Sequence, residues 1–305
     1  RCKNTKFNIK ILIISAVRIA PWILVAIKMS FSQYLKRGLK FIFSGVPIKN
    51  ITAEISYSQP DNRLKNKKII ITGGGRGLGK SMAAKFVAEG AEVLIAGRNE
   101  DTLKRAADEI KCKYLVLDVG NPDSFKDFVL KADGMLGGAN CLVNNAGISL
   151  HERTFFDVTP QTFDAQINTN FKGAFFLTQE FISLTKNRNG KANILFTSSE
   201  TGDTMDFRPY GFTKAAVNSM VQGLAYLFAK DGIRINAVAP GITASDMTGF
   251  KAGGDLFLEN NATERVYLPE EVAETACFLL SDVSGCISGQ IIVCNNARTD
   301  NARWK

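Results

Sequence analysis

The strongest constraint on the fold is a regular alternation of short apolar runs with longer segments of helical length, from about residue 66 onward. The short runs, which read as β-strands, occupy residues 68–72, 92–96, 114–119, 141–145, 193–198, 234–239 and 290–294. Strands that alternate with helices predict a parallel sheet. Because crossovers between parallel strands are right-handed, helices should cover both faces. The sequence therefore predicts an α/β fold with a doubly wound parallel sheet in three α/β/α layers.

The N-terminal region does not share this pattern. Residues 11–27 are apolar but contain Arg18 and Pro21, and the longest uncharged stretch, 19–27, is too short to span a bilayer. We take Met29 as the natural start and residues 1–28 as upstream or non-native sequence. We expect an amphipathic helix and linker over 29–65, one nucleotide-binding domain over 66–296 and a tail over 297–305.

Residues 30–43 have the pattern of a basic amphipathic helix. Ser30 and Gln33 fit a capping box, and Lys36, Arg37 and Lys40 lie opposite the apolar positions. Such a helix can make weak contact with an anionic membrane surface. It can equally pack on the main domain or on a sister subunit, which we favour because one short helix binds membranes weakly.

Charge and rare residues exclude several classes of protein. The net charge is +9, but the first 50 residues carry ten basic and no acidic residues, so residues 51–305 carry −1. The main domain therefore gives no sign of nucleic-acid binding. The six cysteines form no C-x-x-C pair, which favours reduced thiols in a cytoplasmic protein. With His151 as the single histidine, we expect no metal site; His151 itself is a loop residue and a weak candidate for substrate contact.

A glycine-rich turn follows the first predicted strand. Residues 72–79 read TGGGRGLG, and a helix is expected from Lys80 to Glu89. Glycines let the backbone approach a pyrophosphate, while the helix N-terminus supplies free N–H groups and positive dipole. The alternative, a simple tight turn, is disfavoured by the position of the glycines after the first strand. The pattern predicts a Rossmann-like dinucleotide site.

The end of the second strand indicates which nicotinamide cofactor is used. An acidic residue here binds the ribose 2′-hydroxyl in NAD-preferring folds. This chain has Gly97 followed by Arg98, and Arg76 lies in the glycine loop. A guanidinium can pair with a 2′-phosphate. NADP(H) is therefore favoured, with NAD(H) as the alternative and a solvated loop arginine as the structural explanation of Arg98.

The spacing Gly-x-x-x-Gly-x-Gly after Thr72, together with the Asn-Asn-Ala-Gly run at 144–147 and Tyr-x-x-x-Lys at 210–214, resembles the short-chain dehydrogenase/reductase family. The resemblance covers roughly residues 66–296. It implies that Asp118 lies against the adenine and that the Pro240-Gly241 turn abuts the nicotinamide. Ser245 replaces the threonine that usually bonds the carboxamide. The implied cofactor contacts are Gly73, Arg76, Gly77, Leu78, Gly79, Arg98, Asp118, Val119, Asn145, Ala146, Gly147, Tyr210, Lys214, Pro240, Gly241, Thr243 and Ser245.

Tyr210 and Lys214 are spaced to share one helix face. Free tyrosine has a pKa of about 10, and a nearby cation lowers it toward neutrality. Such tuning is what acid/base work at neutral pH requires. We expect Tyr210 to be the acid/base and Lys214 to tune it.

The family resemblance adds two further catalytic residues. Ser199, three positions before Gly202, is implied to bond the substrate oxygen, with Ser198 as the alternative. The interval from Ser199 to Tyr210, eleven positions, is shorter than usual for the family. Asn170, in an Asn-x-x-Gly motif, is implied to hold a water that relays protons to the lysine.

These residues predict an oxidoreductase that moves a hydride between the nicotinamide and a carbonyl or secondary alcohol. Substrate candidates are a β-ketoacyl thioester, a sugar or polyol, or a small ketone. Residues 246–266 occupy the position of the family's mobile lid, and Asn295-Asn296 replace a glycine pair, which could alter subunit contacts. The resemblance implies a homodimer or homotetramer. The alternative function is a catalytically silent nucleotide sensor or scaffold.

Overall fold

A computed structural model describes residues 62–251, 253–259, 261 and 263–297. The predicted extension 1–28, the helix at 30–43 and most of the tail lie outside the described residues. Within the described part, no helix is long and apolar enough to cross a membrane.

The described chain forms a seven-stranded sheet in which every neighbouring pair of strands is parallel. The strand order is β3-β2-β1-β4-β5-β6-β7. The strands are β1 (Lys68–Thr72), β2 (Glu92–Gly97), β3 (Lys113–Val116), β4 (Cys141–Asn144), β5 (Ala192–Thr197), β6 (Ile233–Pro240) and β7 (Ile291–Cys294). The chain winds outward from β1 in one direction and from β4 in the other, so the topology switches between these two strands. Ligands of such sheets bind at the carboxyl ends of the strands at this point.

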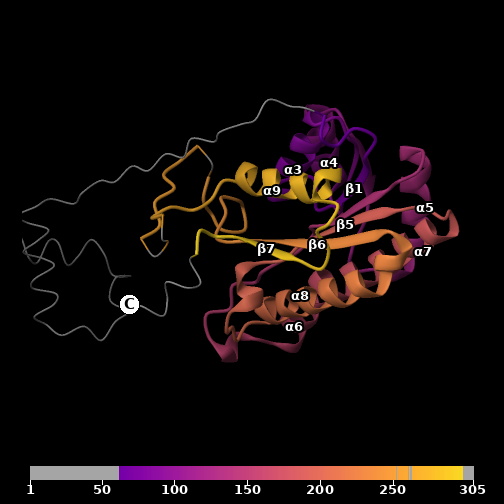
Figure 1. Cartoon of the computed structure of the whole chain (residues 1–305). Helices are drawn as coiled ribbons and strands as arrows, with labels where there is room; N and C mark the ends of the chain where they lie inside the picture. The colour runs from indigo at the N-terminus through magenta and orange to yellow at the C-terminus, as the bar shows by residue number, and fades with distance from the viewer. Residues whose placement is uncertain (1–61, 252, 260, 262, 298–305) are drawn as a thin grey trace, which may run out of the picture. The chain divides into compact units, whose positions relative to one another are not determined.

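Two layers of helices cover the sheet (Figure 1). One face carries α3 (Gly77–Ala88), α4 (Glu100–Ile110) and α9 (Pro269–Leu280). The other carries α5 (Phe125–Leu136), α7 (Gly173–Asn187) and α8 (Pro209–Phe228), with α6 (Pro160–Ile167) beside α8. The predicted three-layer α/β/α sandwich is confirmed.

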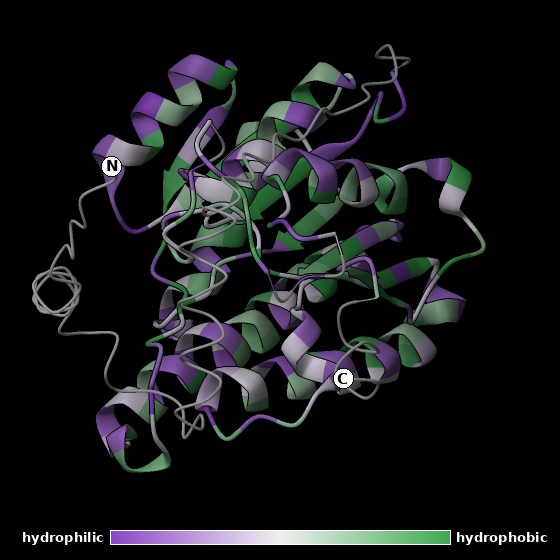
Figure 2. Ribbon diagram, turned by 90° about the vertical axis from the view of Figure 1, so that its left-hand side faces the viewer, coloured by the Kyte–Doolittle hydropathy of each residue, from purple (hydrophilic) through white to green (hydrophobic). Residues whose placement is uncertain are grey.

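Burial on both faces explains why the strands are apolar throughout. In β1, Ile69 and Ile71 face the core under α3, whereas Ile70 faces the core under α5. All three side chains have no exposed surface. A strand covered on both sides reads as a continuous apolar run, and Figure 2 shows these hydrophobic strands enclosed between helices with hydrophilic outer faces.

Three boundaries differ from the expected ones by more than one residue. The third strand ends at Val116, so Asp118 and Val119 lie in the loop that follows it. Helix α3 begins at Gly77, inside the glycine run. The packed domain includes Leu64, which is fully buried and bonds the carbonyl of Glu89, so its contacts begin before residue 66.

Candidate active site

The loops after β1 and β4 interlock at the switch point of the sheet. The Thr72 hydroxyl accepts hydrogen bonds from the backbone N–H groups of Asn145 and Ala146, both at 3.1 Å. In return, the Asn145 side-chain amide donates to the carbonyls of Thr72 and Gly73 at 3.0 and 3.3 Å. The predicted Asn-Asn-Ala-Gly run therefore fixes the start of the glycine-rich loop.

The glycine-rich loop has the shape of a phosphate cradle. Gly73 and Gly77 have positive φ angles of 67° and 52°, which favour glycine. A Cβ at Gly79 would lie 2.3 Å from the carbonyl oxygen of Gly73, so no side chain fits there. A Cβ at Gly77 would enter open space, with only Ser245 within 4 Å. No side chain caps the N-terminus of α3. The loop thus fits the pyrophosphate of a nicotinamide cofactor, with Leu78 in the first turn of the helix.

The second and third strands end beside this loop. Gly97 closes β2, and Arg98 follows it on the surface. Asn99 caps α4 by accepting a hydrogen bond from the N–H of Thr102 at 2.8 Å, which leaves Arg98 at the turn into the helix. Asp118 is exposed and bonds the N–H of Gly120 at 2.9 Å, whereas Val119 is buried.

Helix α8 presents Tyr210 in its first turn, next to Pro209 at its start. Ser199, which is only 8 % exposed, lies beside Tyr210 and acts to lower the tyrosine pKa. The neighbouring Ser198 turns the other way, and its hydroxyl donates to Asn218 of α8 at 2.5 Å. The structure therefore pairs the tyrosine with Ser199, and Ser198 ties the end of β5 to α8.

Lys214 is buried one turn further along α8. Its ammonium donates to the Thr197 carbonyl at 2.7 Å and lies 5.5 Å from the Tyr210 ring centroid. A Cβ at Gly147 would be 3.7 Å from Lys214 Nζ, so the lysine reaches the loop after β4. Burial lowers the pKa of Lys214 to about 8.

The tyrosine pKa differs from the expectation that Lys214 lowers it. Burial raises the pKa of Tyr210 above its ordinary value, and this effect outweighs the opposing hydrogen bond of Ser199 and the charge of Arg208. The physical reason is that both Tyr210 and Lys214 are taken out of water, while the lysine ammonium points to a backbone carbonyl.

Asn170 lies in a π-helical turn, Asn168–Lys172, between α6 and α7. Its side chain is 3 % exposed and exchanges two hydrogen bonds of 2.8 Å with the backbone of Ile148. It also donates to Thr213, whose hydroxyl bonds the Tyr210 carbonyl at 2.7 Å. Asn170 therefore links the loop after β4 to the helical turn of the tyrosine. π-Helical turns are frequent at functional sites.

The segment after β6 closes the site from the other side. Pro240 ends β6, and the Gly241 N–H bonds the carbonyl of Cys294 on β7. Thr243 is buried and bonds the Gly241 carbonyl at 3.0 Å. Ser245 bonds the Thr243 carbonyl at 3.3 Å and lies opposite Gly77.

The predicted lid segment has a small core of its own. Leu256 and Val266 are buried there together with Ala244 and Leu268. Leu256, in the expected lid, is 1 % exposed inside this cluster. An exposed ion pair of 3.4 Å between Asp246 and Arg76 connects the segment to the glycine-rich loop.

Comparison with known proteins decides the family. A family model described as enoyl-(acyl carrier protein) reductase matches residues 73–296. The chain belongs to the short-chain dehydrogenase/reductase family. As a family member it is an oxidoreductase acting on CH–OH or carbonyl groups, and the family binds NAD(P)(H).

Short-chain dehydrogenase/reductases with several substrates resemble the chain. A 3α-hydroxysteroid dehydrogenase of Mediterraneibacter gnavus is 32 % identical over 245 residues, which are 77 % of this chain and 97 % of the relative. A 3-oxoacyl-[acyl-carrier-protein] reductase of Thermotoga maritima is 35 % identical over 240 residues, 75 % and 96 % of the two chains. The crystal structure of a 3-ketoacyl-(acyl-carrier-protein) reductase from Brucella melitensis complexed with NADH is 27 % identical in sequence, with a TM-score of 0.72. The match covers 77 % of this chain and 99 % of that chain.

Several residues at the site were missed by reasoning from sequence. Glu200 follows Ser199, is 5 % exposed, and accepts a hydrogen bond from Asn295. Asp206 and Arg208 form an ion pair just before Tyr210. An acidic residue directly after the predicted serine, at the end of a strand, was a signal for Glu200, but its partner lies 95 positions away. His151 is exposed in a loop with a positive φ of 55°.

Proposed function

We propose that this chain is an NADP(H)-dependent oxidoreductase that transfers hydride between the nicotinamide and a carbonyl or secondary alcohol, with Tyr210 as the acid/base. The observation that carries the proposal is the grouping of Tyr210 with Ser199 beside it and with Lys214 Nζ 5.5 Å from the tyrosine ring. The three groups come from the loop after β5 and from α8, at the edge of the sheet where the glycine-rich loop lies.

The bound cofactor supplies or accepts the hydride. Ser199 and Tyr210 hydrogen-bond the substrate oxygen, which orients the carbonyl and stabilises the negative charge that develops on it. Tyr210 donates its phenolic proton to that oxygen in reduction and takes it back in oxidation. Because burial raises the tyrosine pKa, the phenol is the resting form and reduction needs no prior protonation.

Lys214 and Asn170 belong to the path that returns a proton to Tyr210. Burial brings the lysine pKa to about 8, so the ammonium can give up a proton near neutral pH. We infer that Lys214 binds the nicotinamide ribose and, with Asn170 and water, resupplies the proton to Tyr210. Asn170 contacts the Tyr210 turn through Thr213, which supports this path.

The preference for NADP(H) rests on charge at the end of β2. Gly97 supplies no carboxylate to repel a 2′-phosphate, and the exposed Arg98 follows it. Arg76 of the glycine-rich loop is a second exposed cation, paired with Asp246 at 3.4 Å. Exposed pairs of this kind are weak, so Arg76 can exchange Asp246 for a phosphate.

Fluorescence titration with NADPH and NADH, followed by a panel of carbonyl substrates, tests the proposal. We expect tighter binding of NADPH and turnover that Tyr210→Phe reduces by at least about a thousandfold. NADPH binding should survive in that variant, and Tyr226→Phe, which alters a tyrosine 90 % exposed on the same helix, should leave turnover unchanged. Binding of NADPH without turnover on any substrate would favour a silent sensor or scaffold.

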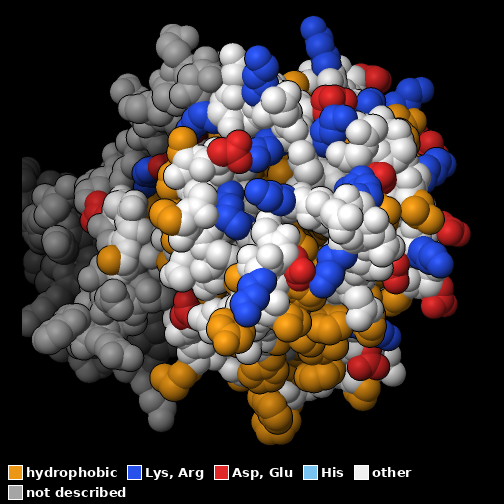
Figure 3. Space-filling model, turned by 45° about the vertical axis from the view of Figure 1, so that its right-hand side comes forward, with side chains coloured by type: hydrophobic (Ala, Val, Ile, Leu, Met, Phe, Trp, Pro, Cys, Tyr) orange, Lys and Arg blue, Asp and Glu red, His pale blue; other side chains and the backbone are white. Residues whose placement is uncertain are grey.

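We also propose a homodimer or homotetramer, since family members are commonly oligomeric. Apolar side chains gather on the lower part of the face in Figure 3, over α7 and α8. A groove of about 350 Å³ lies between these helices and is lined by Phe171, Phe175, Met220, Leu224 and Leu227. Sedimentation of the full chain would give the stoichiometry.

The five described cysteines are free, which supports a cytoplasmic location.

A further inference from the structure

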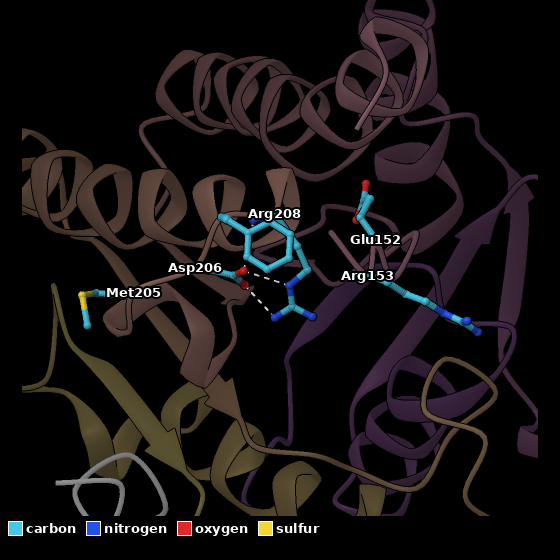
Figure 4. Close-up of a pocket in the computed structure, with 6 residues that line it drawn as sticks. Glu152, Arg153, Met205, Asp206 and Arg208 are labelled. Atoms are coloured by element: carbon cyan, nitrogen blue, oxygen red, sulfur yellow. Dashed lines mark hydrogen bonds and ion pairs between the residues drawn. The ribbon is translucent and has the colours of Figure 1, made fainter. Parts of the chain in front are cut away.

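A cavity of about 650 Å³ adjoins the turn that carries Tyr210. Its walls come from the loop after β4, with Glu152 and Arg153, and from the loop entering α8, with residues 205–208 (Figure 4). The size is that of a small-molecule site. Arg208 and Asp206 both act electrostatically on Tyr210, which places the charged wall of the cavity next to the acid/base.

The guanidinium of Arg208 is held in one orientation. Its Nε and Nη2 donate to the two carboxylate oxygens of Asp206, both at 2.8 Å. The Asp206 side chain is 6 % exposed and also accepts from the Arg208 backbone N–H at 3.0 Å. Gly211 makes room for it, because a Cβ there would lie 2.4 Å from the Asp206 Cβ. The sequence Asp-x-Arg-x-Tyr-Gly thus builds a fixed guanidinium beside the tyrosine.

This arrangement leaves one edge of the guanidinium unused. Arginine has five N–H donors arranged in forks, and Asp206 occupies only the fork formed by Nε and Nη2. Within the described part of the chain, Nη1 has no hydrogen-bond partner. Since Arg208 lines the cavity, Nη1 can donate to an oxygen of a bound molecule.

The charges around Arg208 decide what kind of oxygen fits. The carboxylate of Asp206 already balances the guanidinium. Glu152, 8 % exposed and bonded by the Gln166 amide at 2.6 Å, adds a second negative charge. Arg153 is exposed, and its side chain extends away from the other charged groups in Figure 4. Two cations, Arg153 and Arg208, and two carboxylates, Glu152 and Asp206, line the cavity, and the guanidinium of Arg208 already faces Asp206. The wall around Arg208 therefore carries no excess positive charge, which favours a neutral hydroxyl or carbonyl oxygen over an anionic group.

We propose that Arg208 selects a neutral substrate with a second hydroxyl close to the reacting carbon, as in vicinal diols and α-hydroxy ketones. The inference rests on the proposed function and names its substrate class. In oxidation, Tyr210 first passes its phenolic proton to the neutral amine of Lys214. The carbinol carbon then loses a hydride to the oxidised cofactor, and the carbinol oxygen loses its proton to the resulting Tyr210 phenolate. The product is an α-hydroxy ketone, and the hydroxyl bound by Arg208 is unchanged.

Three six-membered rings that differ in one substituent test the selection: cyclohexanol, cyclohexane-1,2-diol and 2-hydroxycyclohexane-1-carboxylate. With NADP⁺ as oxidant, we expect kcat/KM for one isomer of the diol to exceed that for cyclohexanol by about tenfold or more, the effect of one hydrogen bond to a charged group. The carboxylate should be the poorest substrate. Equal values for cyclohexanol and both diol isomers, or a preference for the carboxylate, would overturn the inference.

Arg208→Lys keeps the cation near Asp206 but removes the second fork. We expect it to abolish most of the preference for the diol, measured as the ratio of kcat/KM for the diol to kcat/KM for cyclohexanol. Arg188→Lys, which alters an ion pair with Asp133 away from the cavity, is the matched control and should retain the preference. If Arg208→Lys fails to fold, Asp206→Asn combined with Arg208→Gln removes both charges and should have the same effect.

Calorimetric titration of the three rings into the NADP⁺-loaded protein separates this inference from the proposed function. Tighter binding of the diol in wild type, lost in Arg208→Lys, supports the selection even if no ring is turned over, a result that would count against the oxidoreductase alone. Turnover of all three rings with equal affinities would uphold the oxidoreductase and overturn the role of Arg208.

Discussion

The side-chain amide of Asn295 donates a hydrogen bond of 3.0 Å to the carboxylate of Glu200, 95 positions earlier in the chain. Both residues are buried, Asn295 to 3 % and Glu200 to 5 % exposure. The Asn295 carbonyl accepts a further bond of 2.6 Å from the Tyr267 hydroxyl. The end of β7 is thereby fixed to the residue after Ser199. Asn295 was expected to alter subunit contacts, but its side chain points into its own subunit.

Replacing Asn295 with alanine should destabilise the protein by about 2 kcal/mol, because a buried carboxylate loses a hydrogen-bond donor. The kcat should fall more than the affinity for NADPH, since Glu200 adjoins Ser199. Urea unfolding and steady-state kinetics measure the two effects. Asn296→Gly is the control: Asn296 is exposed at a positive φ of 45°, so its unfolding free energy should change by less than about 0.5 kcal/mol. An Asn295→Ala variant as stable as wild type would contradict the argument.

Lys214→Met should make the protein more stable at pH 7 while removing activity. The folded-state pKa is about 8 against 10.5 for an ordinary lysine, so the buried ammonium opposes folding by as much as about 3 kcal/mol below pH 8. The variant loses the hydrogen bond to the Thr197 carbonyl, which costs about 1 kcal/mol of stability. The net gain in unfolding free energy is therefore about 2 kcal/mol.

The sign of the pH dependence follows from the lowered pKa of Lys214. Between pH 8 and 10.5 the unfolded wild type binds more protons than the folded one, so wild-type stability rises with pH and the advantage of Lys214→Met shrinks. Urea unfolding of both proteins at pH 7 and pH 9.5 gives the difference. If the difference in unfolding free energy between wild type and Lys214→Met is the same at both pH values, the lysine is not buried as a cation.

Periodicity predicted most of the fold because the inner strands β1, β2, β4, β5 and β6 are covered on both faces and so are largely apolar. Where pairing stops early, as after Val116, apolar character persists in Leu117 and Val119 and the sequence cannot mark the end. The glycine loop was predictable because Gly73 and Gly79 meet steric demands that no other residue satisfies.

The site was less accessible to sequence reasoning because its energetics depend on burial and distant contacts. The spacing of Tyr210 and Lys214 indicated proximity, but the direction of the tyrosine pKa depends on how far both groups are taken out of water. The choice of Ser199 over Ser198 depends on which side of β5 faces Asn218. Both the tyrosine pKa and the orientation of the two serines depend on how α8 packs against the sheet.

Glu89→Gln tests a buried ion cluster far from the catalytic residues. Glu89 has no exposed surface and bonds Arg63 at 2.5 Å and Lys85 at 2.9 Å. Chiefly through Arg63, its pKa is lowered to about 2 from 4.5, so its contribution, about 3 kcal/mol, is complete above pH 4.5 and is lost as pH falls through 2. Glu89→Gln should therefore cost about 3 kcal/mol at pH 7 in urea unfolding, and less at pH 3.

A surface pair provides the control for the Glu89 cluster. Glu109 is 68 % exposed and pairs with Lys80 at 2.6 Å. Glu109→Gln should change the unfolding free energy by less than about 0.5 kcal/mol at either pH, since exposed pairs contribute little. Equal losses in the two variants would mean that the cluster of Arg63, Lys85 and Glu89 is not a stabilising unit.

Gly97→Asp should reverse the cofactor preference. A Cβ at this position would lie 3.6 Å from the Leu103 side chain, an ordinary contact, so the side chain can be accommodated. The new carboxylate would repel a 2′-phosphate and accept a hydrogen bond from a 2′-hydroxyl. We expect the Kd for NADPH to rise at least about tenfold while that for NADH falls or stays within about threefold. Fluorescence titration of both cofactors measures the ratio, and Gly97→Ala, which adds a methyl group without charge, should leave it unchanged. If the ratio of the Kd values for NADPH and NADH is unaltered in Gly97→Asp, the end of β2 does not contact the 2′ position of the ribose. The proposed contacts of Arg76 and Arg98 with a 2′-phosphate would then be wrong.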